Sequence, residues 1–180
     1  MLPSLQSSFE HLEAQRTAFT STLTSASLAE LDYHPAPGAW SIADVARHLS
    51  LTDKGTARVL SERRVTGVPR RTVLDAVYRA PALAMYFRAG GLIRARVPVK
   101  GVIPDADTPL DQVIARWGAA RSALAAYLDT IEAPALGRIV YRHPFGGYMH
   151  IGDTLTFLRR HHDHHMRQVA RIRNSWESSQ

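Results

Sequence analysis

Apolar residues recur at helical spacing in four separate stretches of the chain. In the first stretch, residues 5–25, the repeating and mostly apolar positions are Phe9, Leu12, Arg16, Phe19 and Leu23. The second stretch covers residues 41–63, the third opens near residue 108, and the fourth begins near residue 151. Amphipathic helices of this length can bury their apolar faces against one another around one core. The pattern therefore predicts an all-α fold, a four-helix bundle.

Two of these helices carry recognisable start signals. Ser41 stands at an N-cap position with Asp44 three residues later, which resembles a capping box with Asp in place of Glu. Thr108 is the expected N-cap of the third helix, followed by Pro109 at its first position and Asp111 at its third. These signals predict where the second and third helices begin.

A long segment separates the second helix from the third. Residues 72–89 within it have a helical pattern, but Pro81 should break or kink that helix. We expect a short accessory helix there, within a long crossover between helices two and three. No internal repeat or low-complexity tract divides the chain. Residues 1–174 are therefore expected to form a single domain, and residues 175–180 a polar C-terminal tail.

The fourth helix contains a cluster of histidines, HHDHH at residues 161–165. His161 and His165 are four residues apart, so they point the same way from a helix, and they fall within its apolar stripe. His162 and His164 fall on the flanks of that stripe. Imidazole is the commonest metal ligand in proteins, but a buried pair of histidines can equally be two core side chains hydrogen-bonded to neighbours. Both readings of the pair stay open on this helix alone.

His48 is the candidate for a third ligand. It shares one face of the second helix with Val45, Leu49 and Thr52, so it should point inward. A single histidine on an apolar face is more often a hydrogen-bonded core residue than a ligand. Three imidazoles from two helices, however, suit a divalent transition metal and leave one or more positions for water or substrate.

Two motifs resemble those of a known family. The stretch YHPAPGAWSI at residues 33–42, which leads to His48, resembles the segment that opens the second helix in the DinB-like superfamily. HPFGG at residues 143–147, followed by a helix with His161, His165 and Gln168, resembles the ending of the same family. This superfamily contains DNA-damage-inducible proteins and thiol-dependent transferases, and it is distinct from the translesion polymerase that shares the name.

The resemblance implies a four-helix bundle with a three-histidine metal site formed by His48, His161 and His165. It implies zinc or nickel as the ion. Gln168 follows His165 by one turn, so it can orient a metal ligand or bridge two helices, and we expect it to support a ligand. The resemblance also implies a homodimer with a small-molecule substrate, with or without a thiol cosubstrate, and an association with stress. The expected activity is that of a hydrolase or a low-molecular-weight-thiol S-transferase.

Either reaction needs a proton carrier, and the inward face beside the paired histidines offers no carboxylate. His143, Tyr148 and His150 lie on the segment that enters the last helix and are the catalytic candidates. His143 can alternatively serve only to shape its His-Pro-Phe-Gly turn.

Composition limits the chemistry further. The chain has no cysteine, which excludes a cysteine nucleophile or a thiolate ligand, so any reacting thiol must come with the substrate. The absence of cysteine is compatible with the cytoplasm, and the N-terminus lacks the pattern of a signal peptide. No stretch has the roughly 20 apolar residues of a membrane span. We therefore expect a cytoplasmic protein without a membrane partner.

The net charge of +6 is unevenly distributed. Residues 54–100 contain eleven Lys and Arg against Glu62 and Asp75. Such a segment can attract nucleic acid, an anionic membrane surface or an acidic substrate, or it can be a solvated arginine-rich surface. No helix-turn-helix, zinc-finger or RNA-recognition signature accompanies it, so we do not expect nucleic acid as a partner.

Three functional hypotheses follow from the sequence. The first is a metal-dependent hydrolase or thiol transferase with His48, His161 and His165 as ligands. The second is a non-catalytic bundle that binds a metal or a small ligand. The third is a basic protein associated with DNA, which requires salt-dependent binding to duplex DNA.

Overall fold

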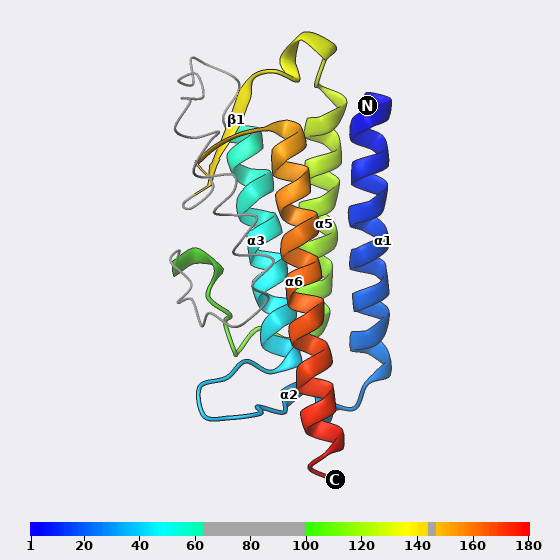
Figure 1. The fold of residues 1–180 in the computed structure, drawn as a ribbon, viewed down its shortest axis with the longest axis vertical. Coiled ribbons are helices and arrows are strands. Elements are labelled where there is room, and N and C mark those ends of the chain that lie inside the picture. The colour runs from blue at the N-terminus through cyan, green and yellow to red at the C-terminus, as the bar shows by residue number, and fades with distance from the viewer. Residues whose placement is uncertain (63–99, 144–146) are drawn as a thin grey trace.

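The computed structural model describes residues 1–62, 100–143 and 147–180. Its helices are α1 (Pro3–Ser25), α2 (Leu28–Asp32), α3 (Ile42–Glu62), α5 (Leu110–Asp129) and α6 (Ile151–Glu177), with short 3₁₀ turns η2 (Lys100–Val102) and η3 (Ala133–Ala135). The long helices α1, α3, α5 and α6 lie side by side (Figure 1). They correspond to the four predicted helices, so the mostly helical bundle is confirmed. No helix among the described residues is long and apolar enough to cross a membrane.

The four long helices do not alternate in direction along the chain. In Figure 1, α1 and α6 run downward, whereas α3 and α5 both run upward. α3 therefore ends at the upper end of the bundle in this view, and α5 begins at the lower end. The predicted accessory helix and most of the crossover fall on residues 63–99, outside the described residues. The basic segment lies largely there too.

Local hydrogen bonds determine where the helices start. Asp44 N donates to Ser41 Oγ and Ser41 N to Asp44 Oδ2, both at 3.2 Å, so the predicted capping box is present. The predicted N-cap of the third long helix is wrong by one residue, because Pro109 is the N-cap of α5. The Thr108 hydroxyl donates to Asp105 Oδ2 at 2.9 Å, and α5 has no side-chain cap hydrogen bond.

A short β-hairpin precedes α6 and was not predicted. Strands β1 (Ile139–His143) and β2 (Gly147–His150) pair antiparallel, and the register has an irregularity between Ile139 and Tyr141. His150 ends β2 and is also the N-cap of α6. The predicted catalytic candidates His143, Tyr148 and His150 therefore belong to hairpin strands. At its other end α6 continues to Glu177, so the tail begins as helix.

Two apolar clusters fill the bundle, one near each end. The first includes Leu5, Leu12, Leu60, Leu124, Leu128 and Leu155. The second includes Phe19, Leu31, Val45, Leu49, Trp117 and Val169. On α1, α3 and α5 a charged residue falls between the members of the two clusters: Glu13, Asp53 and Arg121.

These charged residues form a buried network across the helices. Arg121 Nη2 lies 2.7 Å from Asp53 Oδ2, and Trp117 Nε1 donates to the same oxygen. Arg121 Nε lies 3.6 Å from Glu13 Oε1. Burial raises the pKa of the Asp53 carboxyl, and the Arg121 guanidinium opposes that rise. Each of these three charged side chains lies beside a side chain of opposite charge. This pairing offsets the cost of placing charged groups inside the bundle.

Candidate metal centre

Three histidines from two helices meet between α3 and α6. His48 comes from α3, and His161 and His165 come from successive turns of α6. The Nε2 atom of His161 lies 3.2 Å from that of His48 and 3.1 Å from that of His165. The three ligand atoms all lie within 4.8 Å of one another, so the group could hold a metal ion. The structure thus brings together the three residues that were predicted as ligands.

Hydrogen bonds behind the rings leave two of the Nε2 atoms free to bind. His48 Nδ1 lies 2.7 Å from the carbonyl oxygen of Val102 in η2. A carbonyl can only accept, so Nδ1 carries the proton and Nε2 of the neutral ring keeps its lone pair. His165 Nδ1 donates in the same way to Gln168 Oε1 at 2.9 Å. An imidazole whose far nitrogen donates to an oxygen is the usual arrangement of a metal-binding histidine.

The spacing of the nitrogens fits a bound ion. Nitrogens held about 2.0–2.1 Å from an ion at tetrahedral angles are roughly 3.3–3.4 Å apart. The two Nε2–Nε2 distances around His161, 3.1 and 3.2 Å, are close to that value. Neutral nitrogen donors without carboxylates suit zinc and nickel better than magnesium or calcium. The residues present therefore fit a divalent transition metal.

The ligand rings are neutral over the physiological range. Burial lowers the pKa of His48 to about 4. Burial and the neighbouring histidines lower the pKa values of His161 and His165 well below their usual range. His161 Nε2 lies within hydrogen-bond distance of the unprotonated Nε2 atoms of His48 and His165, so it carries the proton between them. Because all three rings are neutral, binding a metal needs that proton to move to His161 Nδ1 but needs no net loss of a proton.

Aromatic side chains enclose the histidines. The Trp40 indole stacks on His165 with ring centres 6.0 Å apart and planes 18° apart, and its centre lies 4.9 Å from that of His48. On the other side, Phe157 stacks on His161 at 5.4 Å and 15°. Trp40 also lines an open cavity of about 750 Å³ formed by residues 34–40. The two aromatic rings restrict the access of water to the ligands.

The contribution of Trp40 was not predicted, although the residue belongs to the motif that carried the family resemblance. Its position directly before the capping residue Ser41 is a signal that could have found it. No sequence feature identifies the Val102 carbonyl as a hydrogen-bond acceptor for His48, because every residue has a backbone carbonyl. Both contacts hold rings of the histidine group in place.

The three catalytic candidates have different surroundings. The His143 ring packs on Phe157 with centres 4.3 Å apart, and Phe157 in turn stacks on His161. Burial lowers the pKa of His143 to about 4. His150 Nδ1 lies 3.1 Å from Asp153 Oδ2 within the capping box of α6. Tyr148 is half-buried in β2.

His162 does not lie on the flank of α6 as predicted. Only 3% of this residue is exposed, and its ring packs edge-on against Phe19 at 6.2 Å and lies 6.1 Å from Trp117. The prediction was wrong because α6 packs against both α1 and α3, so its buried face is wider than a single stripe. His162 therefore points into the core on the side of α1, away from the metal-binding group.

Comparison with known proteins agrees with this architecture. The family model described as the DinB superfamily matches residues 11–169. A solved structure described as "Crystal structure of TT2238, a four-helix bundle protein" is similar with a TM-score of 0.52. That similarity covers 96% of this chain and 98% of that chain at 21% identity, so it concerns the fold alone. No match was found among curated protein sequences.

Proposed function

This chain belongs to the DinB superfamily, and from that premise we propose that it is a metal-dependent enzyme, either a hydrolase or a low-molecular-weight-thiol S-transferase. In this proposal His48, His161 and His165 hold one divalent ion, zinc or nickel. The observation that carries the proposal is the approach of three Nε2 atoms with the rings of His48 and His165 hydrogen-bonded from behind.

The three ligands are neutral, so a bound ion keeps its full charge and lowers the pKa of a water or a thiol beside it. Val102 and Gln168 orient the rings of His48 and His165 for that task. Trp40 and Phe157 exclude water from the sides of the group. Since the chain has no cysteine, the thiol of a transferase reaction would come with the substrate.

We assign proton transfer to His143 as part of this proposal. Its charge is one of those that lower the pKa of His161, so the two rings are close enough to interact. With a pKa of about 4 it is neutral at physiological pH, so its unprotonated nitrogen can accept a hydrogen bond from a group bound near His161 as that group loses its proton. The variant His143→Phe keeps an aromatic ring against Phe157 but removes both nitrogens. It should retain the metal and lose roughly 10²–10⁴-fold in turnover. Unchanged turnover would remove His143 from the mechanism.

The first experiment is a measurement of metal content by plasma mass spectrometry on wild type, His48→Ala and His165→Ala. We expect about one ion per chain in wild type and loss in both variants, with helical circular dichroism retained. His11→Ala, which removes an exposed histidine of α1, is the matched control and should keep the ion. No ion in wild type after reconstitution with zinc and nickel would end the proposal.

The second experiment separates an enzyme from a non-catalytic bundle. Metal-loaded wild type and His165→Ala are assayed on esters, amides and a thiol mixed with an electrophile. Turnover by wild type alone supports the enzyme and identifies the reaction class. Full metal occupancy without turnover across the screen favours the alternative, a bundle that binds a metal or small ligand. The family resemblance also supports a cytoplasmic, stress-related homodimer, and light scattering after size exclusion tests the dimer.

A further inference from the structure

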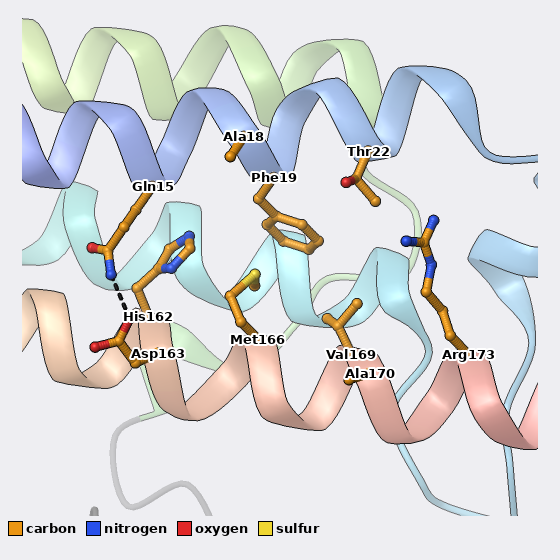
Figure 2. Close-up of a pocket in the computed structure, with 10 residues that line it drawn as sticks. All are labelled: Gln15, Ala18, Phe19, Thr22, His162, Asp163, Met166, Val169, Ala170 and Arg173. Carbon is orange, nitrogen blue, oxygen red and sulfur yellow. Dashed lines mark hydrogen bonds between the residues drawn. The ribbon is translucent and has the colours of Figure 1, made fainter.

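A second recess lies between α1 and α6, on the side of α6 that does not carry the metal-binding group (Figure 2). Its volume is about 360 Å³, within the range of cavities that hold small molecules. The residues that line it are Gln15, Ala18, Phe19, Thr22, His162, Asp163, Met166, Val169, Ala170 and Arg173. We call it the α1–α6 groove.

Most of the α1–α6 groove is apolar. Phe19 and Val169 are buried side chains that form its floor, and Met166 lies between His162 and Val169 (Figure 2). Ala18 and Ala170 are exposed on the two helices, and their small side chains leave the groove open to solvent. An apolar body of a ligand would gain free energy by covering this floor.

One end of the groove is polar and incompletely hydrogen-bonded. Gln15 Nε2 donates to Asp163 Oδ1 at 2.6 Å, but the buried Gln15 Oε1 has no partner among the described residues. Both ring nitrogens of His162 also lack a partner there, although the residue is only 3% exposed. A buried polar group without a partner costs about 1–3 kcal/mol, so such groups call for an explanation. A ligand that supplies the partners would recover part of that cost.

The unpaired atoms indicate what that ligand offers. A neutral imidazole has one donor and one acceptor, and Gln15 Oε1 adds another acceptor. Groups that both donate and accept, a hydroxyl or an amide, complement this set. An anionic group is disfavoured, because the Asp163 carboxylate at this end of the groove repels it. A neutral polar group can pair with the neutral imidazole and amide without bringing a charge into the groove. At the far end, Arg173 is already paired with Glu30 at 2.7 Å.

We propose that the α1–α6 groove binds a small neutral molecule with an apolar or aromatic body and a hydroxyl or amide group. The body lies on Phe19 and Val169, and the polar group exchanges hydrogen bonds with His162 and Gln15. The nitrogens of His162 are shielded from solvent, so a ligand must displace a neighbour to reach them. Met166 lies next to His162 in the groove (Figure 2), and we expect it to move, because its unbranched thioether changes rotamer at low cost.

The test uses benzyl alcohol, benzamide and toluene as probes, and follows binding by the methyl resonance of Met166 in protein labelled at methionine methyl groups. We expect saturable shifts, and an alcohol-to-toluene affinity ratio that falls about tenfold in His162→Phe, the value of one hydrogen bond. The variant keeps an aromatic ring between Phe19 and Trp117. A ratio within twofold of wild type, or no saturable shift for any probe, would overturn the proposal.

A second pair of variants tests the location without touching the core. Ala18→Trp fills the groove from its exposed rim, whereas Thr17→Trp places the same side chain on the exposed surface of α1 outside the groove. Ala18→Trp should weaken probe binding at least tenfold, and Thr17→Trp should leave it unchanged. Equal binding by both would place the probes elsewhere and refute the assignment. Metal content should be the same in both, because the two sites use different faces of α6.

Discussion

Zinc binding to the three-histidine group should release very few protons near pH 6. A metal binds only the unprotonated nitrogen, so every ligand that is protonated beforehand must lose its proton. The structure places all three rings in an environment that opposes protonation. Burial lowers the pKa of His48 to about 4, and burial and the neighbouring histidines lower those of His161 and His165 well below their usual range.

The number of protons released follows from these pKa values. A histidine with an ordinary pKa of about 6.5 is roughly three-quarters protonated at about pH 6, so three such ligands would release about two protons. His48, with a pKa of about 4, is only about 1% protonated at that pH. His161 and His165, whose pKa values lie well below the usual range, also add few protons. Ionisation of a metal-bound water with a pKa near 7 would add about 0.1 of a proton. Because the three histidine rings interact, their pKa values describe the titration of the three-histidine group rather than of each ring alone.

Isothermal titration calorimetry in two buffers with different protonation enthalpies measures this number directly. We expect well under half a proton at about pH 6, and zinc affinity that stays constant down to about pH 5. The lowered pKa of His48 sets the direction of the pH dependence. Zinc binding is complete above that pKa and is lost as the pH falls through about 4. Release of about two protons at pH 6 would refute the reasoning, because the ligands would then titrate as exposed histidines.

Further predictions concern the surroundings of the site and the buried network. Gln168→Ala removes the acceptor behind His165 and should weaken zinc binding about 10–100-fold by competition with a chromophoric chelator, with the fold unchanged. Nickel should quench the emission of Trp40, and the quenching should be absent in Trp40→Phe, which retains the ring and the metal. Arg121→Met should cost about 3–5 kcal/mol of unfolding free energy in urea, because it leaves the Asp53 carboxylate unpaired. The double variant with Asp53→Leu should be more stable than Arg121→Met alone, and a lower stability would contradict the pairing.

The helices were predictable because their apolar period extends over 20 or more residues, as in α3, with 21 residues, and α6, with 27. The hairpin was not, since β1 has five residues and β2 four, too few for an alternating pattern to stand out. The register irregularity between Ile139 and Tyr141 interrupts the alternation further. A strand this short forms because it pairs with another strand, and the sequence pattern does not show which segment it pairs with.

The metal-binding group was predictable for a similar reason. His48, His161 and His165 each share a face with apolar residues of a long helix, so the phase of the helix alone turns them inward. The contacts that orient the rings could not be obtained in this way. Val102 contributes a backbone carbonyl, and Trp40 reaches His165 from a segment before α3 whose path no periodicity describes.

The run of histidines at residues 161–165 therefore does not act as one unit. Successive residues of a helix point about 100° apart, so neighbours in the run face different helices. His161 and His165 turn toward His48 on α3, whereas His162 turns toward Phe19 on α1 and Trp117 on α5. A substitution at residue 161 and one at residue 162 should consequently affect separate properties, metal content in the first case and packing beside the α1–α6 groove in the second. The density of histidines in a sequence is thus a weaker guide to a metal site than the helical phase that each one occupies.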